Sequence, residues 1–211
     1  MLEISIFDTF KMSNQLTGKA KRQRKIIKII GGSKVPDQRT KVEISKMVGI
    51  ENEQSWKNSY SGVYEDIEKI FLPQRIIEEE GKIPVRRGPR LLQKEGTGYY
   101  KLTKIGKLLL FGIGDKIDID FREYTDEPNL GADLNSLYET NQELCFLLIE
   151  NYISMNCTNR EEILPIRSEK FSQTSSQKLR CDLDFVKSML SISKEEQDKI
   201  LEILSRIDSK H

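Results

Sequence analysis

Two short stretches of the sequence gather side chains that can bind phosphate groups and the edges of bases. In the first, guanidinium and ammonium groups lie close enough together to hold several phosphate oxygens. It consists of Arg86, Arg87, Arg90 and Lys94. The second joins a lysine to amide and hydroxyl groups of the kind that read base edges. It consists of Lys57, Asn58, Ser59, Tyr60 and Ser61.

Enzyme chemistry has less support. The one histidine is His211, the last residue, where nothing would fix it as a general base, so we expect no serine–histidine or cysteine–histidine pair. Pro36-Asp37 and Glu80-Gly81-Lys82 have the pattern of a magnesium-dependent nuclease. That chemistry needs carboxylates on adjacent rigid strands, whereas one motif follows a Gly-Gly pair and the other lies at a turn. The sequence therefore predicts no enzyme, cofactor or metal.

The remaining candidate ligands are sparse. Asp118 and Asp120 would share one side of a strand as half a metal site, although an acidic connector explains them as well. Cys145, Cys157 and Cys181 match neither zinc nor redox spacing. An odd cysteine number and a start without a secretory signal favour reduced thiols in the cytoplasm. The apolar runs are too short to predict a membrane span.

Charge divides the chain. The sequence carries a net charge of only +1, yet residues 1–110 hold 22 Lys and Arg against 13 Asp and Glu, a net of +9. Residues 111–211 hold 12 against 20, a net of −8. Such an asymmetry predicts that the first half meets a polyanion, the alternative being two solvated surfaces that differ in charge.

The first basic stretch lies in a predicted β-hairpin. Residues 91–93 and 99–102 are β-favouring, and residues 94–98 between them contain two glycines suited to a turn. Before residue 91, Pro84, Gly88 and Pro89 interrupt regular secondary structure. Thr103 can then cap an apolar helix that contains residues 105–110.

Three helices are predicted before this hairpin. The first spans residues 18–30, ends at two glycines, and carries six cations that could also touch phosphate. They are Lys19, Lys21, Arg22, Arg24, Lys25 and Lys28. A short second helix follows Thr40, which has capping-box spacing to Glu43. The third begins near residue 59 or 61 and ends at Pro73.

This order resembles the winged helix-turn-helix domain of small prokaryotic transcription regulators. The resemblance rests on KVEISKMVG, SGVYEDIEKIF and RRGPRLLQKEGTGYYKLTKIGKLLL, especially the aromatic-Lys-Leu-Thr-x-x-Gly ending. It implies a regulator whose third helix enters the major groove of double-stranded DNA while the hairpin, or wing, follows the backbone. One feature disagrees with it. Glu65, Asp66 and Glu68 fall on the expected exposed face of the third helix and would repel phosphate. The alternative is therefore a winged-helix protein-interaction module.

The second half reads as helical from residue 134 onward. The predicted organisation is an arm (1–18), a winged helix (19–112), an acidic connector (113–130) and an all-α domain (131–211). The fold class is thus mainly α with a small β-hairpin. An apolar stripe over residues 134–153 predicts a homodimer through the C-terminal helices, or else a core helix. Residues 168–177 read as a loop, residues 185–190 as a helix, and Ser193 as the cap of a last helix.

Overall fold

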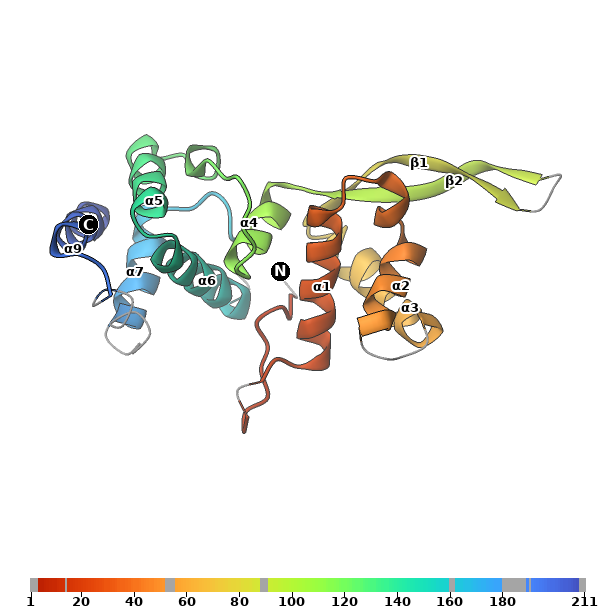
Figure 1. Ribbon diagram of the computed structural model, residues 1–211, viewed down its shortest axis with the longest axis horizontal. Coiled ribbons are helices and arrows are strands. Elements are labelled where there is room, and N and C mark those ends of the chain that lie inside the picture. The colour runs from red at the N-terminus through yellow and green to blue at the C-terminus, as the bar shows by residue number, and fades with distance from the viewer. Residues whose placement is uncertain are drawn as a thin grey trace. The chain divides into compact units, whose positions relative to one another are not determined.

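The computed structural model describes residues 4–13, 15–51, 56–87, 91–159, 162–179, 189 and 191–208. It is mainly helical with a two-stranded antiparallel sheet, which confirms the predicted fold class (Figure 1). The chain divides into two compact units, Glu3–Leu110 and a unit that contains Phe111–His211. Within the described ranges, no helix has the length and apolar character needed to cross a bilayer.

The first unit begins with helix α1, Gly18–Gly32. Thr17 caps it by accepting a hydrogen bond from the Ala20 amide, and the helix ends at the predicted glycines. Its inward face buries a strip of residues against the rest of the unit. They are Ala20, Gln23, Ile26, Ile27 and Ile30. A 3-10 turn η1, Pro36–Arg39, then leads to the second helix.

Helix α2 (Lys41–Glu51) packs against α3 (Trp56–Glu65), which continues as the π-helical segment η2 (Asp66–Phe71). The predicted cap of α2 is confirmed, because the Glu43 amide donates to Thr40 Oγ1 at 3.4 Å. Helix α3 starts at Trp56, three residues before the earliest predicted start. Val42 is exposed, because Ile44, Ser45 and Val48 occupy the inward face of α2.

The structure contains a hairpin in this region, but its strands differ from the predicted ones. Strand β1 is Ile77–Arg87, and it pairs antiparallel with a single strand β2, Leu91–Leu102. Residues 94–98 therefore lie within β2 instead of forming the turn, and residues 88–90 between the strands lie outside the described residues. The buried Ile76 and Ile77 anchor the start of β1, which draws the three glutamates that follow into the sheet.

An irregularity in the pairing explains why glycines occur inside β2. Ile83 pairs with Thr97 and Val85 pairs with Gln93, so Pro84 faces an expanded segment of β2. Proline has no amide to donate and is tolerated at such a bulge. Gly96 lies in the bulge with φ +66°, and a Cβ there would stand 2.8 Å from the Ile83 carbonyl oxygen.

Replacing Gly96 with alanine should therefore destabilise the first unit. The left-handed backbone alone costs an L-residue about 1–2 kcal/mol, which corresponds to a fall of several degrees in melting temperature. Gly32→Ala is the matched control, because a Cβ there meets no atom within 4 Å and its φ is not positive. Thermal unfolding of both variants checks this, and an equal melting temperature for the two would contradict the bulge geometry.

Two further contacts fix the hairpin to the helices of its unit. An antiparallel bridge joins Thr40, just before α2, to Tyr99 of β2. At the other end, helix α4 (Lys104–Gly112) follows β2 directly, and the Gly106 amide donates to Thr103 Oγ1 at 3.3 Å, as the predicted cap requires. The hairpin is thus held at its base by both α2 and α4.

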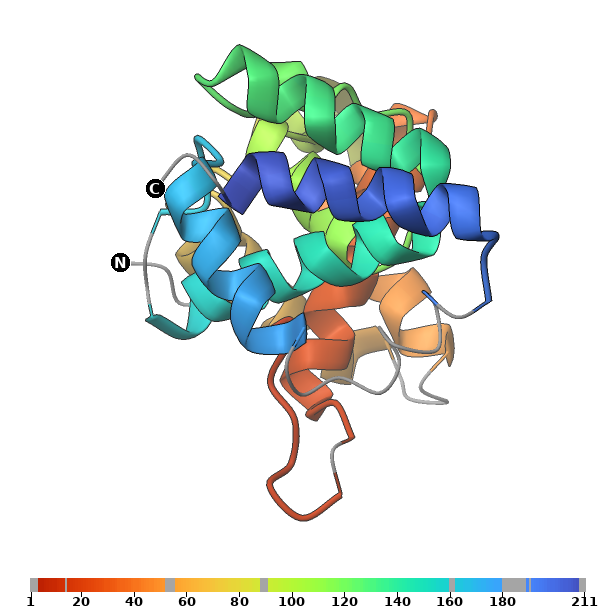
Figure 2. The same ribbon diagram turned by 90° about the vertical axis from the view of Figure 1, so that its left-hand side faces the viewer.

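The second unit consists of a 3-10 turn and packed helices (Figure 2). Its elements are η3 (Phe121–Glu123), α5 (Pro128–Thr140), α6 (Gln142–Asn159), α7 (Ser168–Leu179) and α9 (Lys194–Asp208). Helix α9 contacts α5 and α7. Phe111 lies in an aromatic cluster, with its ring 4.4 Å from Phe146 and 5.4 Å from Tyr138, centroid to centroid.

The apolar stripe at 134–153 belongs to two helices instead of one. Asn141 separates α5 from α6, and its side chain accepts a hydrogen bond from the Leu144 amide at 3.0 Å, as a helix cap does. Leu134, Leu148 and Ile153 are all buried inside this unit. The stripe is therefore a core, and its burial removes the main reason for predicting a homodimer.

Residues 168–177, predicted to be a loop, instead form most of α7. The Ser168 amide donates to Glu127 Oε1 at 2.9 Å, and Phe171 packs fully buried, its ring 5.9 Å from that of Tyr152. These contacts outweigh the low helix propensity of the serines. The predicted cap at Ser193 is confirmed by its reciprocal bonds with Glu196. The helix predicted at 185–190 falls mostly outside the described residues.

Candidate nucleic-acid interface

Few of the described side chains of α3 face away from the first unit. Ser61 and Tyr64 are exposed, and Tyr64 stacks on the partly buried Tyr60 at 6.2 Å between ring centroids. Ser59, a predicted contact, is only 7% exposed and points into the unit. Lys57 and Asn58 lie in the first turn of α3, and their side chains fall outside the described part of the structure.

Asp66 does not lie on that outward face, contrary to the sequence expectation. Its side chain is fully buried, accepting a hydrogen bond from Arg22 Nε at 2.6 Å and another from Gln23 Nε2 at 2.9 Å. The expectation fails because it assumes that a charged side chain faces outward. Helical spacing puts Asp66 one turn from the buried Val63 and Ile70, so α3 turns it inward.

The same network reaches the N-terminal arm. Gln23 Oε1 accepts the Ser5 amide at 2.9 Å, and Arg24 Nε donates to the Ile6 carbonyl at 2.6 Å. Ile4 and Ile6 are buried within this unit. The arm therefore packs on α1 and holds α1 at the position that receives Asp66.

Glu68, another of the three carboxylates expected to repel phosphate, is bonded to Lys41 at the start of α2. The Lys41 ammonium lies 4.9 Å from the ring centroid of Tyr64 and 5.8 Å from that of Tyr100. Burial alone would lower the pKa of Lys41, but hydrogen bonds to Glu68 and Tyr100 raise it above its ordinary value. Burial in turn raises the pKa of Tyr100, which Lys41 partly offsets. A permanent cation thus stands beside the exposed ring of Tyr64.

Only Glu65 of the three carboxylates is exposed on α3, and Lys69 pairs with it at 3.2 Å. Exposed i,i+4 pairs of this kind are weak and easily exchanged for other partners. The electrostatic objection to α3 facing phosphate is therefore much reduced. Among the described side chains of α3 and η2, a hydroxyl, an aromatic ring and one exchangeable ion pair face outward.

The hairpin cations lie away from its acidic base. Arg86 and Arg87 end β1 and Lys94 lies in β2, while Arg90 falls outside the described residues. At about 3.3 Å per residue, the backbone of Arg86 stands about 20 Å from that of Glu80 along the strand. The backbone positions of Arg86 and Arg87 in β1 are therefore well separated from those of the glutamates at 78–80.

The glutamates at the base have partners of their own. Glu78 pairs with Lys101 across the strands at 3.2 Å, and Glu80 pairs with Arg39 at 2.6 Å. Arg39 also lies over the ring of Tyr99, 5.2 Å from its centroid. These contacts join η1 to the hairpin base and leave the cationic part of the hairpin beyond them.

The candidate metal motifs have other roles. Glu80 of the nuclease-like pattern lies in β1, not at a turn, and is held by Arg39. Asp120 accepts the Asn135 amide at 2.6 Å, and this bond, with others, lowers the pKa of Asp120 below its ordinary value. Across the part of the chain that the structure describes, no three His, Cys, Asp or Glu residues cluster as a metal site would need.

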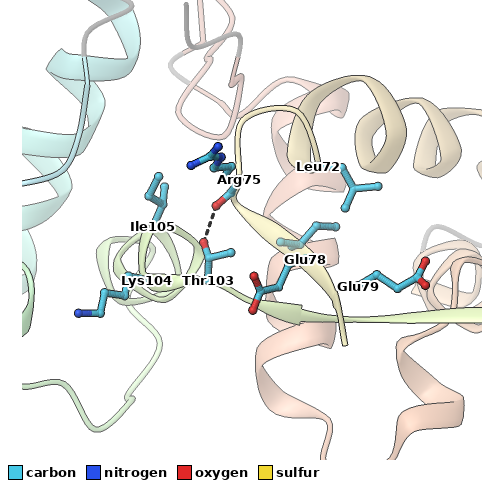
Figure 3. A pocket seen from close by; sticks show the side chains of 8 residues that line it. Leu72, Arg75, Glu78, Glu79, Thr103, Lys104 and Ile105 are labelled. Atoms are coloured by element: carbon cyan, nitrogen blue, oxygen red, sulfur yellow. Dashed lines mark hydrogen bonds between the residues drawn. The ribbon is translucent and has the colours of Figure 1, made fainter. Parts of the chain in front are cut away.

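Two of the hollows among the described residues of the first unit bear on this question. One, of about 510 Å³, lies where β1 meets the start of α4 (Figure 3). Arg75 and Lys104 share its lining with Glu78 and Glu79, and Thr103 donates across it to the Arg75 carbonyl. The other, of about 520 Å³, is named the α1 groove. Its lining is Leu16, Lys21, Arg22, Arg24, Lys25, Lys28 and Ile29.

Sequence reasoning missed the contact between α1 and α3. Two signals pointed to this contact. Asp66 lies three residues after the buried Val63 and so on the inward face of its helix. Gly62 leaves room for the guanidinium of Arg22 beside α3, since a Cβ at this position would lie 2.8 Å from the Arg22 guanidinium carbon. Comparison of the chain with protein-family models, with curated protein sequences and with solved structures finds no match.

Proposed function

We propose that the first unit is a winged helix that binds double-stranded DNA and that the chain is a transcription regulator of the cytoplasm. The observation that carries this proposal is the inward bond of Asp66 to Arg22 and Gln23. This bond turns the negative charge of Asp66 inward, away from the helix surface that has to approach phosphate. The net charge of +9 over residues 1–110 supports the same partner, and the buried thiols Cys145 and Cys157 are compatible with a reducing compartment.

In this proposal, the first turn of α3 enters the major groove. Asn58 and Ser61 would contact base edges, and Lys57 would contact a phosphate. The hairpin would follow the DNA backbone with Arg86 and Arg87, while the Lys41 cation beside Tyr64 neutralises Glu68 at the helix. Phosphate contacts set the affinity, and the base contacts set the register.

Ser61→Glu tests whether this face of α3 meets DNA. A carboxylate at an exposed position facing phosphate should weaken duplex binding at least tenfold, about 1.4 kcal/mol. Ser205→Glu is the control, because Ser205 is also exposed on a helix but lies in the second unit. Fluorescence anisotropy with a labelled duplex measures both. Equal affinities for the two variants would mean that α3 does not face DNA.

A protein-interaction module is the second candidate, and two side chains favour it. Val42 and Ile50 are exposed on α2, Ile50 by 75%, whereas a helix that only supports a DNA reader needs no apolar surface. In that case the unit would serve a transcription complex or another cytoplasmic assembly without reading DNA. Val42→Ser with Ile50→Ser should then abolish partner binding, while duplex binding should be unchanged if the first proposal holds.

A homodimer through the C-terminal helices remains a proposal with reduced support. Leu201 on α9 is half exposed, and regulators that read paired half-sites are usually two-fold dimers. Multi-angle light scattering of the full chain at micromolar concentration should give twice the 24.5 kDa monomer mass. A single species at the monomer mass would contradict it.

A further inference from the structure

Most of the cations of the α1 groove lie on the side of α1 that faces away from α2 and α3, while Arg22, at its edge, reaches Asp66. The inward face of α1 is occupied by residues such as Gln23 and Ile27, which pack against the unit. At 100° per residue, Lys21, Lys25 and Lys28 fall on the opposite side of the helix. Figure 1 shows α2 and α3 together on one side of α1. Apart from Arg22, the cations of the groove are therefore separate from the outward face of α3.

The chemistry of the groove is uniform. Five of its seven lining residues are cations and none is acidic, whereas the hollow near α4 mixes two cations with two carboxylates. Arg22 and Arg24 of the groove are held in place by contacts within this unit. Asp66 fixes Arg22, while the Ile6 carbonyl and the ring of Phe7, 5.1 Å from the guanidinium carbon, fix Arg24. Cations fixed beforehand lose less entropy when an anion binds.

An apolar loop tip stands beside the groove. Thr9 bridges to Leu16, and Leu16 is itself part of the groove lining. The tip of this loop exposes Phe10 by 55% and Met12 fully. Apolar and aromatic side chains next to cations are the combination with which proteins contact bases and base steps beside a phosphate backbone.

We propose that the α1 groove is a second nucleic-acid site that takes the phosphate backbone of another DNA segment, so that one chain holds two segments together. Lys21 and Lys28 contact phosphates, and Phe10 and Met12 lie against the sugar and base edges. This inference rests on the proposed function, because it assumes that α3 and the hairpin hold the first segment.

A capture experiment separates the two sites. Full-length protein is bound to an immobilised 20-base-pair duplex, and recovery of a second, labelled duplex is measured over a salt series. Lys21→Gln with Lys28→Gln should leave affinity for the first duplex unchanged and strongly reduce second-duplex capture. Because this variant lacks two of the cations that contact phosphate, the slope of log capture constant against log salt should flatten by about 1.8. Lys34→Gln with Lys107→Gln, two exposed lysines of the same unit, is the matched control and should change neither quantity.

Each other outcome overturns the inference in a recognisable way. If the groove variant weakens first-duplex binding, the groove belongs to the first interface. If second-duplex capture persists in the groove variant, bridging comes from paired copies of the chain and not from this groove. If wild-type protein binds the first duplex but captures no second, the inference fails and the proposed function stands. If it binds no duplex, both fail.

Discussion

Asp66→Ala should unfold the first unit more readily than any surface substitution in α3. It leaves the Gln23 amide buried without its acceptor and the Arg22 guanidinium without its counter-charge. Breaking a buried pair by removing one partner costs about 3–5 kcal/mol, and the partial exposure of Arg22 places the expected loss at about 3 kcal/mol. Urea unfolding followed by tryptophan fluorescence measures it, since the sequence has one tryptophan, Trp56, and it lies in α3.

Glu65→Ala is the matched control for this prediction. Glu65 is the neighbouring residue on the same helix, but it is exposed and forms only a surface ion pair with Lys69. Its removal should cost less than about 0.5 kcal/mol. If Asp66→Ala and Glu65→Ala shift the urea midpoint equally, the Arg22–Gln23–Asp66 network does not hold α3 in place. The explanation for the weakly charged face of α3 would then fail with it.

Replacing Arg86, Arg87 and Arg90 with alanine should weaken binding to every duplex sequence. Removing one phosphate contact lowers the slope of log affinity against log salt by about 0.9, so removing three flattens it by roughly two to three units. Sequence preference should remain, because base readout is assigned to α3. Titrations at four or more salt concentrations against two unrelated duplexes measure both effects.

Lys34, Lys104 and Lys107 provide the control for the hairpin. They are exposed lysines of the same unit outside the hairpin, so their triple replacement by glutamine changes net charge equally. It should alter the slope far less than the arginine triple. A hairpin variant that folds normally and binds with unchanged affinity and slope would show that the hairpin does not touch DNA. The protein-interaction candidate would then be favoured.

Local signals in the sequence are sufficient for much of the helical framework. Thr40, Thr103 and Ser193 are predicted as caps, and each bonds the helix start assigned to it. The Gly-Gly pair ends α1 as expected. These features depend on residues three or four apart, so a single stretch of sequence contains the information that determines them.

Distant partners decide the rest. The predicted hairpin is misplaced because the mate of residues 99–102 is the glutamate-rich 77–81 segment, which looks like a solvated link. Asp66 is misassigned because its burial depends on Arg22, 44 residues earlier. Helix α7 forms because Phe171 finds a buried site beside Tyr152. Among the predicted site residues, Ser59 is buried because it lies four residues before the buried Val63, whereas Ser61 lies one turn from the exposed Tyr64 and Glu65.

The most direct test of DNA binding by the first unit is a salt-dependent titration of the purified full chain against duplex DNA. If Lys57, Arg86, Arg87, Arg90 and Lys94 each contact a phosphate, log affinity should fall against log salt with a slope of about −4.5. A slope close to zero, or no measurable binding at low salt, would contradict the claim that the first unit holds DNA through α3 and the hairpin.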